Sequence, residues 1–469
     1  MTFGRSARVS SFGAMALLLL ACSSTTDTIG SDQGVSSLSG AAGAAGLSGY
    51  GGAGGVLGSA GTGGVAPQPP TLMQLSGPDS YPNPLHDELL IASDDVNSRV
   101  EDTFDQLFHG DANKEAIYFT SATNTDDSIT LADDEAIVKD VYHDNVRTEG
   151  MGLGMLICVE LGKSDEFDML WNYAKRVLRF QTGSPNVGYF RSFCDATMTS
   201  GSGGSTPCVD PYGAEMFVMS LIFAHDRGFP NADEYGADAL DVLNVMLHWE
   251  DINGGISDAG TTDTFDSETK LAFDIPNVSA ASLTRPSVLM PAFYTLWAQA
   301  TGNPFFKTAA TSARGFFQKA ADENTGLIPL RAYFDGTPVP GSDTFTPEAY
   351  RVLPNIVLDE LWTTDTENST AAIKEINRVL GFFASQGISS YGTDYQLDGT
   401  IVSGQTMHEP ALVFTNGMTA MLSTIDAQDR QAFMQDVWNM KTPTGSARYF
   451  QGIMQLFALL VLSGQMQVY

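Results

Sequence analysis

The sequence predicts an all-α protein in which helical hairpins form a closed ring. From about Asp94 onward, apolar residues recur at helical spacing, and few stretches alternate as strands do. Several helices, such as Phe217 to Ala224 and Ile453 to Leu462, are apolar on more than one face, which is typical of helices buried on both sides. Longer polar loops occur at every second connection, as expected if inner and outer helices alternate.

The helical pattern divides into about twelve helices. The first carries Val96, Val100, Phe104 and Phe108 on one face, with Ser93 or Asp94 placed to cap it. A second follows Glu149. The others are expected at Glu166 to Phe180, Gly213 to Arg227, Tyr235 to Trp249, Ser287 to Ala300, Pro304 to Ala321, Glu348 to Trp362, Thr370 to Ser385, Pro410 to Ile425, Arg430 to Met440, and Arg448 to Ser463.

The first 22 residues are predicted to be an export signal. Arg5 and Arg8 precede a short apolar run that ends in Leu19-Leu20-Ala21-Cys22, which resembles a bacterial lipobox with Cys22 as the lipidated residue. An ordinary signal peptide cut a few residues later is the alternative. Residues 23–75 are predicted to be a flexible linker, because the chain there is largely Gly, Ala, Ser and Thr. Residues 76–469 are expected to form one domain. We expect an exported protein, either an outer-membrane lipoprotein or a protein of the cell surface, in a Gram-negative bacterium.

The net charge of −31, from 55 acidic and 24 basic residues, argues against nucleic acid as a partner. It also argues against an anionic membrane surface, so we expect membrane contact only through the N-terminal lipid. Cys158 is expected to be a buried thiol, and Cys194 and Cys208 flank a loop that a disulfide could close. The histidines are scattered and no CxxC or HExxH motif occurs, so neither a metal nor a cofactor is expected. We expect a monomer.

The stretch VRTEGMGLGM, residues 146–155, contains the first candidate for chemistry. Glu149 stands between Arg147 and alternating glycines that open an apolar helix. A carboxylate held at such a helix start is suited to general acid catalysis. Alternatively, Glu149 only complements the helix dipole, and the glycines only ease helix packing.

From about Arg99 to Tyr469 the chain resembles glycoside hydrolase family eight, and within it the reducing-end xylose-releasing exo-oligoxylanases. The segments that carry the resemblance are RVEDTFDQLFHGD (99–111), VRTEGMGLGM (146–155), FDMLWNYAK (167–175), TGLIPLRAYFDGTP (325–338), AYRVLPNIVLDELW (349–362) and RYFQGIMQLFALLVLSG (448–464). The resemblance implies an (α/α)6 barrel that hydrolyses β-1,4-linked glycans with inversion. It also implies that residues 76–469 are the catalytic domain.

The resemblance further implies that Glu149 is the general acid. The family's base is usually an aspartate three residues before an arginine, a position that Glu348 occupies relative to Arg351. The alternatives are that Glu348 is only a dipole partner, or that Asp343 is the base. Substrate contacts are expected from Asp210, Tyr212, Tyr333, Arg351 and His408. Tyr212 replaces a family aspartate, and Arg285 begins a segment in which three family contacts are changed.

Two functions remain open from the sequence. The first is an inverting hydrolase of β-1,4-linked glycans, most simply xylan or xylo-oligosaccharides, with β-glucan and chitosan as further substrates of the family. The second is a catalytically impaired barrel that binds glycans at the cell surface, suggested by the replaced sugar contacts.

Overall fold

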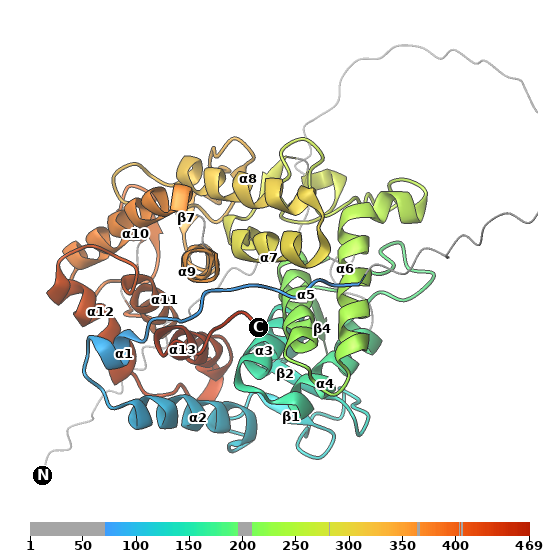
Figure 1. The fold of residues 1–469 in the computed structure, drawn as a ribbon, viewed down its shortest axis with the longest axis horizontal. Coiled ribbons are helices and arrows are strands. Elements are labelled where there is room, and N and C mark those ends of the chain that lie inside the picture. Colours follow the sequence, from blue (N-terminus) through green and yellow to red (C-terminus); the bar gives the residue numbers. More distant parts are fainter. Residues whose placement is uncertain (1–70, 196–208, 281, 364–365, 403, 405–406) are drawn as a thin grey trace, which may run out of the picture. The chain divides into compact units, whose positions relative to one another are not determined.

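The computed structural model describes residues 71–195, 209–280, 282–363, 366–402, 404 and 407–469. Six helices form an inner ring in which each helix contacts the next, and the last contacts the first (Figure 1). They are α3 (Thr148–Leu161), α5 (Pro211–Asp226), α7 (Pro291–Thr301), α9 (Val352–Trp362), α11 (Pro410–Ala420) and α13 (Arg448–Leu462). Most of their residues are buried, as the apolar residues on several faces predict.

Six outer helices cover this ring. They are α2 (Ser93–His109), α4 (Ser164–Tyr173), α6 (Ala232–Asn253), α8 (Pro304–Ala320), α10 (Thr366–Gln386) and α12 (Ala427–Asn439). Helix α2 packs on α13, α4 on α3, α6 on α5, α8 on α7, and α12 on α11. Helix α10 packs on both α9 and α11. This arrangement confirms the ring of helical hairpins. The described residues also contain the four-residue α1 (Pro84–Asp87), which raises the number of α-helices to thirteen.

Two helix starts were predicted four residues too early, and prolines explain both. A helix was expected from Ser287, but residues 286–288 form a 3-10 turn and α7 begins at Pro291. Another was expected from Glu348, but residues 347–351 are turns and α9 begins at Val352. A proline is tolerated in the first turn of a helix and disrupts its interior, so Pro291 and Pro354 limit where these helices start.

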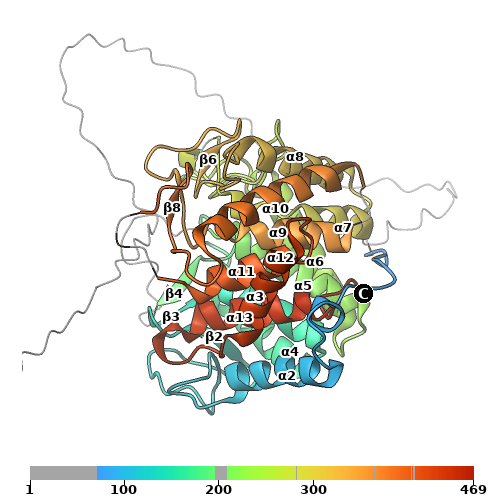
Figure 2. The same ribbon diagram turned by 90° about the vertical axis from the view of Figure 1, so that its left-hand side faces the viewer.

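Short strands that the sequence did not predict connect the loops leading into the inner helices. The antiparallel strands β1 (Tyr118–Thr120), β2 (Ala136–Asp140), β3 (Asn145–Arg147) and β4 (Phe193–Asp195) form one sheet in that order, with Tyr118 opposite Val138 and Val146 opposite Cys194. Two further pairs are β5 (Leu283–Thr284) with β6 (Ala332–Tyr333), and β7 (Thr344–Phe345) with β8 (Tyr395–Gln396). Figure 2 shows β3, β4, β6 and β8 along the same side of the ring.

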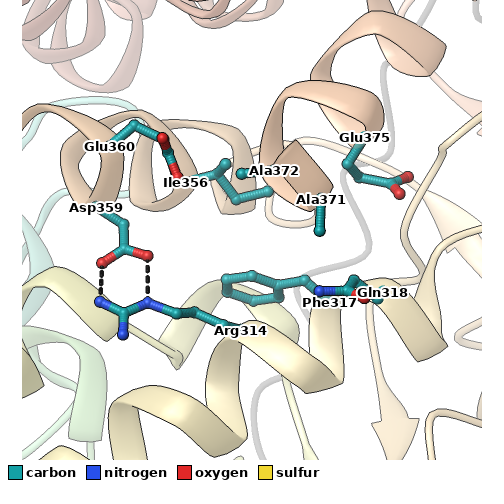
Figure 3. Close-up of a pocket in the computed structure, with 9 residues that line it drawn as sticks. All are labelled: Arg314, Phe317, Gln318, Ile356, Asp359, Glu360, Ala371, Ala372 and Glu375. Atoms are coloured by element: carbon teal, nitrogen blue, oxygen red, sulfur yellow. Dashed lines mark hydrogen bonds and ion pairs between the residues drawn. The ribbon is translucent and has the colours of Figure 1, made fainter. Parts of the chain in front are cut away.

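Close helix contacts and one buried ion pair hold the ring together. A Cβ on Gly213 of α5 would lie 2.7 Å from the carbonyl carbon of Thr148, so α3 and α5 approach too closely there for any larger residue. Between α8 and α9, Arg314 donates from Nε and Nη2 to the two oxygens of Asp359, each at 2.6 Å (Figure 3). This bidentate pair lines a small pocket that α10 also borders.

Within the described part of the chain, no helix has the length and apolar content needed to cross a membrane.

Candidate active site

The residues that meet at the candidate site come from the starts of the inner helices. Glu149 is the second residue of α3, Asp210 is the N-cap of α5, and Arg351 directly precedes α9. Helix N-termini carry partial positive charge, which stabilises carboxylates placed there. The ring therefore gathers several helix starts around a group of acidic side chains.

Arg351 is the centre of this group. It is 2% exposed, and its Nη1 lies 2.6 Å from Oε1 of Glu149 while its Nη2 lies 3.9 Å from Oε2 of Glu348. One guanidinium therefore lies between the two carboxylates and brings them to the same site. Both remain accessible, since the Glu149 side chain is 20% exposed and that of Glu348 is 39% exposed.

Tyr212 and Tyr449 enclose Arg351 and Glu149. The guanidinium of Arg351 lies over the ring of Tyr212, 4.7 Å from its centroid, and Tyr212 is 5% exposed. The hydroxyl of Tyr449 lies so close to Gly150 that a Cβ there would clash with it. Burial raises the pKa of both phenols, so they are neutral hydrogen-bonding groups at neutral pH.

Arg285 contacts Glu348 from the start of the α7 segment. Its Nη1 donates to Oε2 of Glu348 at 2.9 Å, and its Nε lies 2.6 Å from Asp274. Asp274 also accepts from Nε of Arg331 at 2.6 Å. Burial by itself would raise the pKa of Glu348, but the charges of Arg285 and Arg351 outweigh burial and lower it to about 2. Glu348 is therefore ionised at any pH at which the protein would normally work.

Asp210 is a third carboxylate near this pair. It is 7% exposed, and one of its oxygens accepts the Tyr212 backbone N–H at 3.1 Å, as an N-cap does. The pKa of Asp210 is raised to about 6 in all, because burial and the charge of Glu149 raise it more than Arg285 and Arg351 lower it. The sequence singled out Asp210, and the structure brings it into the electrostatic reach of Glu149, Arg285 and Arg351.

The remaining predicted contacts lie further out. Tyr333 is 40% exposed on β6, which pairs with the strand that leads into Arg285. His408 has both ring nitrogens engaged, Nδ1 with the Tyr391 carbonyl at 3.2 Å and Nε2 with Asp436 at 2.9 Å. Asp343, the substitute base, is exposed in the loop before β7.

Sequence reasoning missed Tyr449, Asp274 and Arg331. Tyr449 lies in a family segment, RYFQGIMQLF, and that position was its only signal. Nothing in the sequence linked Asp274 to Arg285. Cys158 is a free, fully buried thiol, as predicted. Cys22 and Cys208 lie outside the described residues, so the lipidation and disulfide predictions remain predictions.

Comparison with known proteins connects this geometry to a family. The model of glycosyl hydrolases family 8 matches residues 128–464, well over half of the chain. The chain is 32% identical over 384 residues to a reducing end xylose-releasing exo-oligoxylanase of Halalkalibacterium halodurans, covering 80% of this chain and 91% of that protein. It is also 24% identical over 319 residues to endoglucanase C of Ruminiclostridium cellulolyticum, covering 68% of this chain and 63% of that protein.

The solved structures agree with the sequence comparison. The structure of Rex8A from Paenibacillus barcinonensis complexed with xylose matches with a TM-score of 0.72 and 30% identity, covering 83% of this chain and 98% of that chain. Its curated sequence, named a reducing-end xylose-releasing exo-oligoxylanase, is 30% identical over 411 residues, covering 85% of this chain and all of Rex8A. The ring is thus the (α/α)6 barrel expected from the resemblance. The chain belongs to glycosyl hydrolase family 8, close to the exo-oligoxylanases, and is a glycoside hydrolase of β-linked glycans.

Proposed function

We propose that the protein is an inverting hydrolase of β-1,4-linked xylan or xylo-oligosaccharides. The observation that carries the proposal is the pair of accessible carboxylates, Glu149 and Glu348, that share the guanidinium of Arg351. Inverting glycosidases hold their two carboxyl groups about 6.5–9.5 Å apart, which leaves room for a water molecule. The contacts of Glu149 and Glu348 with Arg351 hold two carboxylates at one site, as a mechanism with an acid and a base requires.

In this mechanism, Glu149 donates its proton to the glycosidic oxygen as the bond to the anomeric carbon breaks. Glu348 takes a proton from the water that attacks the opposite face of the sugar. The low pKa of Glu348 keeps it in the ionised form that a general base requires, and it also makes that base weaker. Arg351 positions both carboxylates, and Asp210 and Tyr212 are placed to contact the sugar. The reaction requires no metal or organic cofactor.

Glu149→Gln tests the assignment of the acid. The amide cannot donate a proton of comparable acidity, so we expect kcat on xylotriose to fall by about 10²–10⁴-fold. Thermal unfolding should be unchanged, because Gln can retain the contact with Arg351. Glu323→Gln, at an exposed position, is the matched control. A Glu149→Gln enzyme with full activity would contradict the assignment of Glu149 as the acid. Inversion is tested separately, by proton NMR that identifies the anomer first released by the wild-type enzyme.

A second candidate function is glycan binding without cleavage. The observation that favours it is the ion pair between Arg285 and Glu348, the proposed base. The charge of Arg285 lowers the affinity of the Glu348 carboxylate for a proton. Incubation with xylo-, cello- and chitosan oligosaccharides separates the functions. New reducing ends support hydrolysis and identify the substrate, whereas saturable binding without cleavage supports the binding function.

A further inference from the structure

The turn that follows Arg285 is held by a side chain of α9. Nδ2 of Asn355 donates to the Ser287 carbonyl at 2.9 Å and to the Leu289 carbonyl at 3.1 Å. Asn355 is buried, and its amide nitrogen has two protons, so both donors are used within the protein. Asn355 lies four residues after Arg351. The segment that bears Arg351 therefore also holds the turn that follows Arg285.

A second side chain holds the carbonyl group between these two. The Tyr294 hydroxyl, on α7, lies 3.2 Å from the Val288 carbonyl oxygen and 2.8 Å from Oε1 of Glu215, on α5. One hydroxyl proton cannot form two full hydrogen bonds, and a carbonyl group has no proton to give. Both contacts are therefore full hydrogen bonds only when Glu215 is a protonated acid that donates to Tyr294, while Tyr294 donates to Val288. Burial raises the pKa of Glu215 well above its ordinary value, in agreement with a protonated acid.

The turn determines where Arg285 can reach. The Val288 backbone N–H donates to the Arg285 carbonyl at 3.0 Å, so the residue is joined to the turn by its own backbone. The other charged groups that act on Glu348 or Arg285 are Arg331, Arg351, Asp210 and Asp274. All four are attached to other segments of the chain. A displaced turn would therefore change the position of Arg285 and leave these groups where they are.

We propose that Asn355 and Tyr294 are positioning residues for the base, with Glu215 as a neutral hydrogen-bond donor to Tyr294. Together they hold the turn at the place where Arg285 contacts Glu348. All three side chains are buried, so they act through Arg285 and not on the sugar. This inference rests on the proposed function, in which Glu348 takes a proton from water.

The acid limb of the kcat/KM profile on xylotriose tests the proposal in full-length Tyr294→Phe and Asn355→Ala. A displaced Arg285 lets the pKa of Glu348 rise, so at pH 4 we expect about a twofold or greater loss relative to pH 6, beyond any change in the wild type. Tyr189→Phe is the matched control, because this buried hydroxyl also donates to a backbone carbonyl, at 2.9 Å. It should lower the melting temperature by a similar amount and leave the limb in place.

A double variant shows whether the effect passes through Arg285. When Arg285→Gln is already present, Tyr294→Phe should move the limb no further, because the contact that the turn holds is gone. An additional shift in the double variant would overturn the proposal. If Asn355→Ala does not fold, Tyr294→Phe decides the question, because phenylalanine fills nearly the same volume.

Glu215→Gln tests the neutral donor. The amide N–H can still donate to Tyr294, so the limb should stay at its wild-type position. In the wild type, Glu215 ionises above its ordinary pKa only in the unfolded chain, which favours unfolding as pH rises. The melting temperature of Glu215→Gln should therefore rise relative to that of the wild type between pH 4 and 7. A difference that does not change with pH would overturn the role of Glu215 as a protonated donor.

Crystal structures of Tyr294→Phe and Asn355→Ala separate this inference from the proposed function. A lengthened distance from Nη1 of Arg285 to Oε2 of Glu348, with a moved limb, supports the inference. An unchanged distance would overturn it, as would a limb that moves equally in Tyr189→Phe. A lengthened distance with an unmoved limb would support the positioning of Arg285 and contradict Glu348 as the base. The same distance change in a protein whose wild type cleaves no sugar would support the positioning and contradict hydrolysis.

Discussion

At the scale of single residues, the contact between Arg285 and Glu348 has the most direct consequence for activity. The low pKa of Glu348 is caused by the neighbouring charges of Arg285 and Arg351, which outweigh the effect of burial. A base whose pKa is about 2 stays ionised far into the acid range, so protonation of Glu348 should not limit activity in mildly acidic buffers. An enzyme with an unpaired glutamate would begin to lose activity nearer pH 4.5.

We predict that Arg285→Gln moves the acid limb of the kcat/KM profile upward. Removing the cation raises the pKa of Glu348 towards its ordinary value, so the base becomes protonated as pH falls through the new pKa. At pH 4 we expect about a threefold to fivefold loss relative to pH 6, beyond any change in the wild type. Initial rates on xylotriose across pH 3–7 measure this. Arg176→Gln, which removes a half-exposed arginine elsewhere, should leave the limb in place. An unchanged limb in Arg285→Gln would show that Glu348 does not control it.

Single residues also mark the limit of sequence reasoning about the site. The resemblance to the family, carried by the motif around Glu149 and the position of Glu348 before Arg351, predicted these residues as one site before any coordinates. The ion pairs of Asp274 with Arg285 and Arg331 join segments about 10 to 60 residues apart, and no periodicity or motif encodes such a contact. Likewise, the engaged nitrogens of His408 depend on Asp436 of a different helix.

At the scale of elements, the contact between α3 and α5 positions the proposed acid. Gly213 lies against the backbone of Thr148, the residue before Glu149. Helix existence and type were predictable because apolar spacing is a local property of the chain. The short ladders β5–β6 and β7–β8 were not, because two-residue strands carry no periodicity and form only when the ring brings their loops together.

We predict that Gly213→Ala destabilises the protein and displaces Glu149. The added methyl group would lie 2.7 Å from the Thr148 carbonyl carbon, so backbone must move. We expect the free energy of unfolding, measured by denaturant titration, to fall by about 1–3 kcal/mol. Steady-state kinetics should show a loss of kcat.

Gly315→Ala on α8 is the control for this prediction, because nothing lies within 4 Å of the position that its Cβ would take. It should stabilise the protein by about 0.5–1 kcal/mol and leave kcat unchanged. Equal effects of the two substitutions would contradict the role of close helix contact.

At the scale of the whole molecule, the fold was largely predictable and the cellular setting remains a proposal. The ring of hairpins follows from twelve segments that are apolar on one or several faces, and the additional α1 is too short to show a pattern. We propose that the protein is exported and held at the outer membrane by a lipid on Cys22, with residues 23–75 as the linker. The motif at residues 19–22 and the composition that follows support this proposal.

We predict that Cys22→Ala releases the protein from the membrane fraction, since the thiol is the only attachment point for the lipid in this proposal. The measurement is the distribution of the expressed protein between the membrane and soluble fractions. A second measurement is its partition into the detergent phase of a detergent–water mixture. Ser23→Ala should retain membrane association. Equal membrane association of Cys22→Ala and wild type would contradict lipid anchoring.

The starts of the inner helices make the site modular. Each start supplies one side chain of the group around Arg351: Glu149 from α3, Tyr212 from α5, Arg285 from the segment before α7, and Glu348 from the turn before α9. The apolar bodies of the helices behind them form the ring independently of which residue stands at each start. In the proposed hydrolase, specificity can therefore change one position at a time while the barrel persists, and the resemblance implies such exchanges at Tyr212, Arg285 and Glu348.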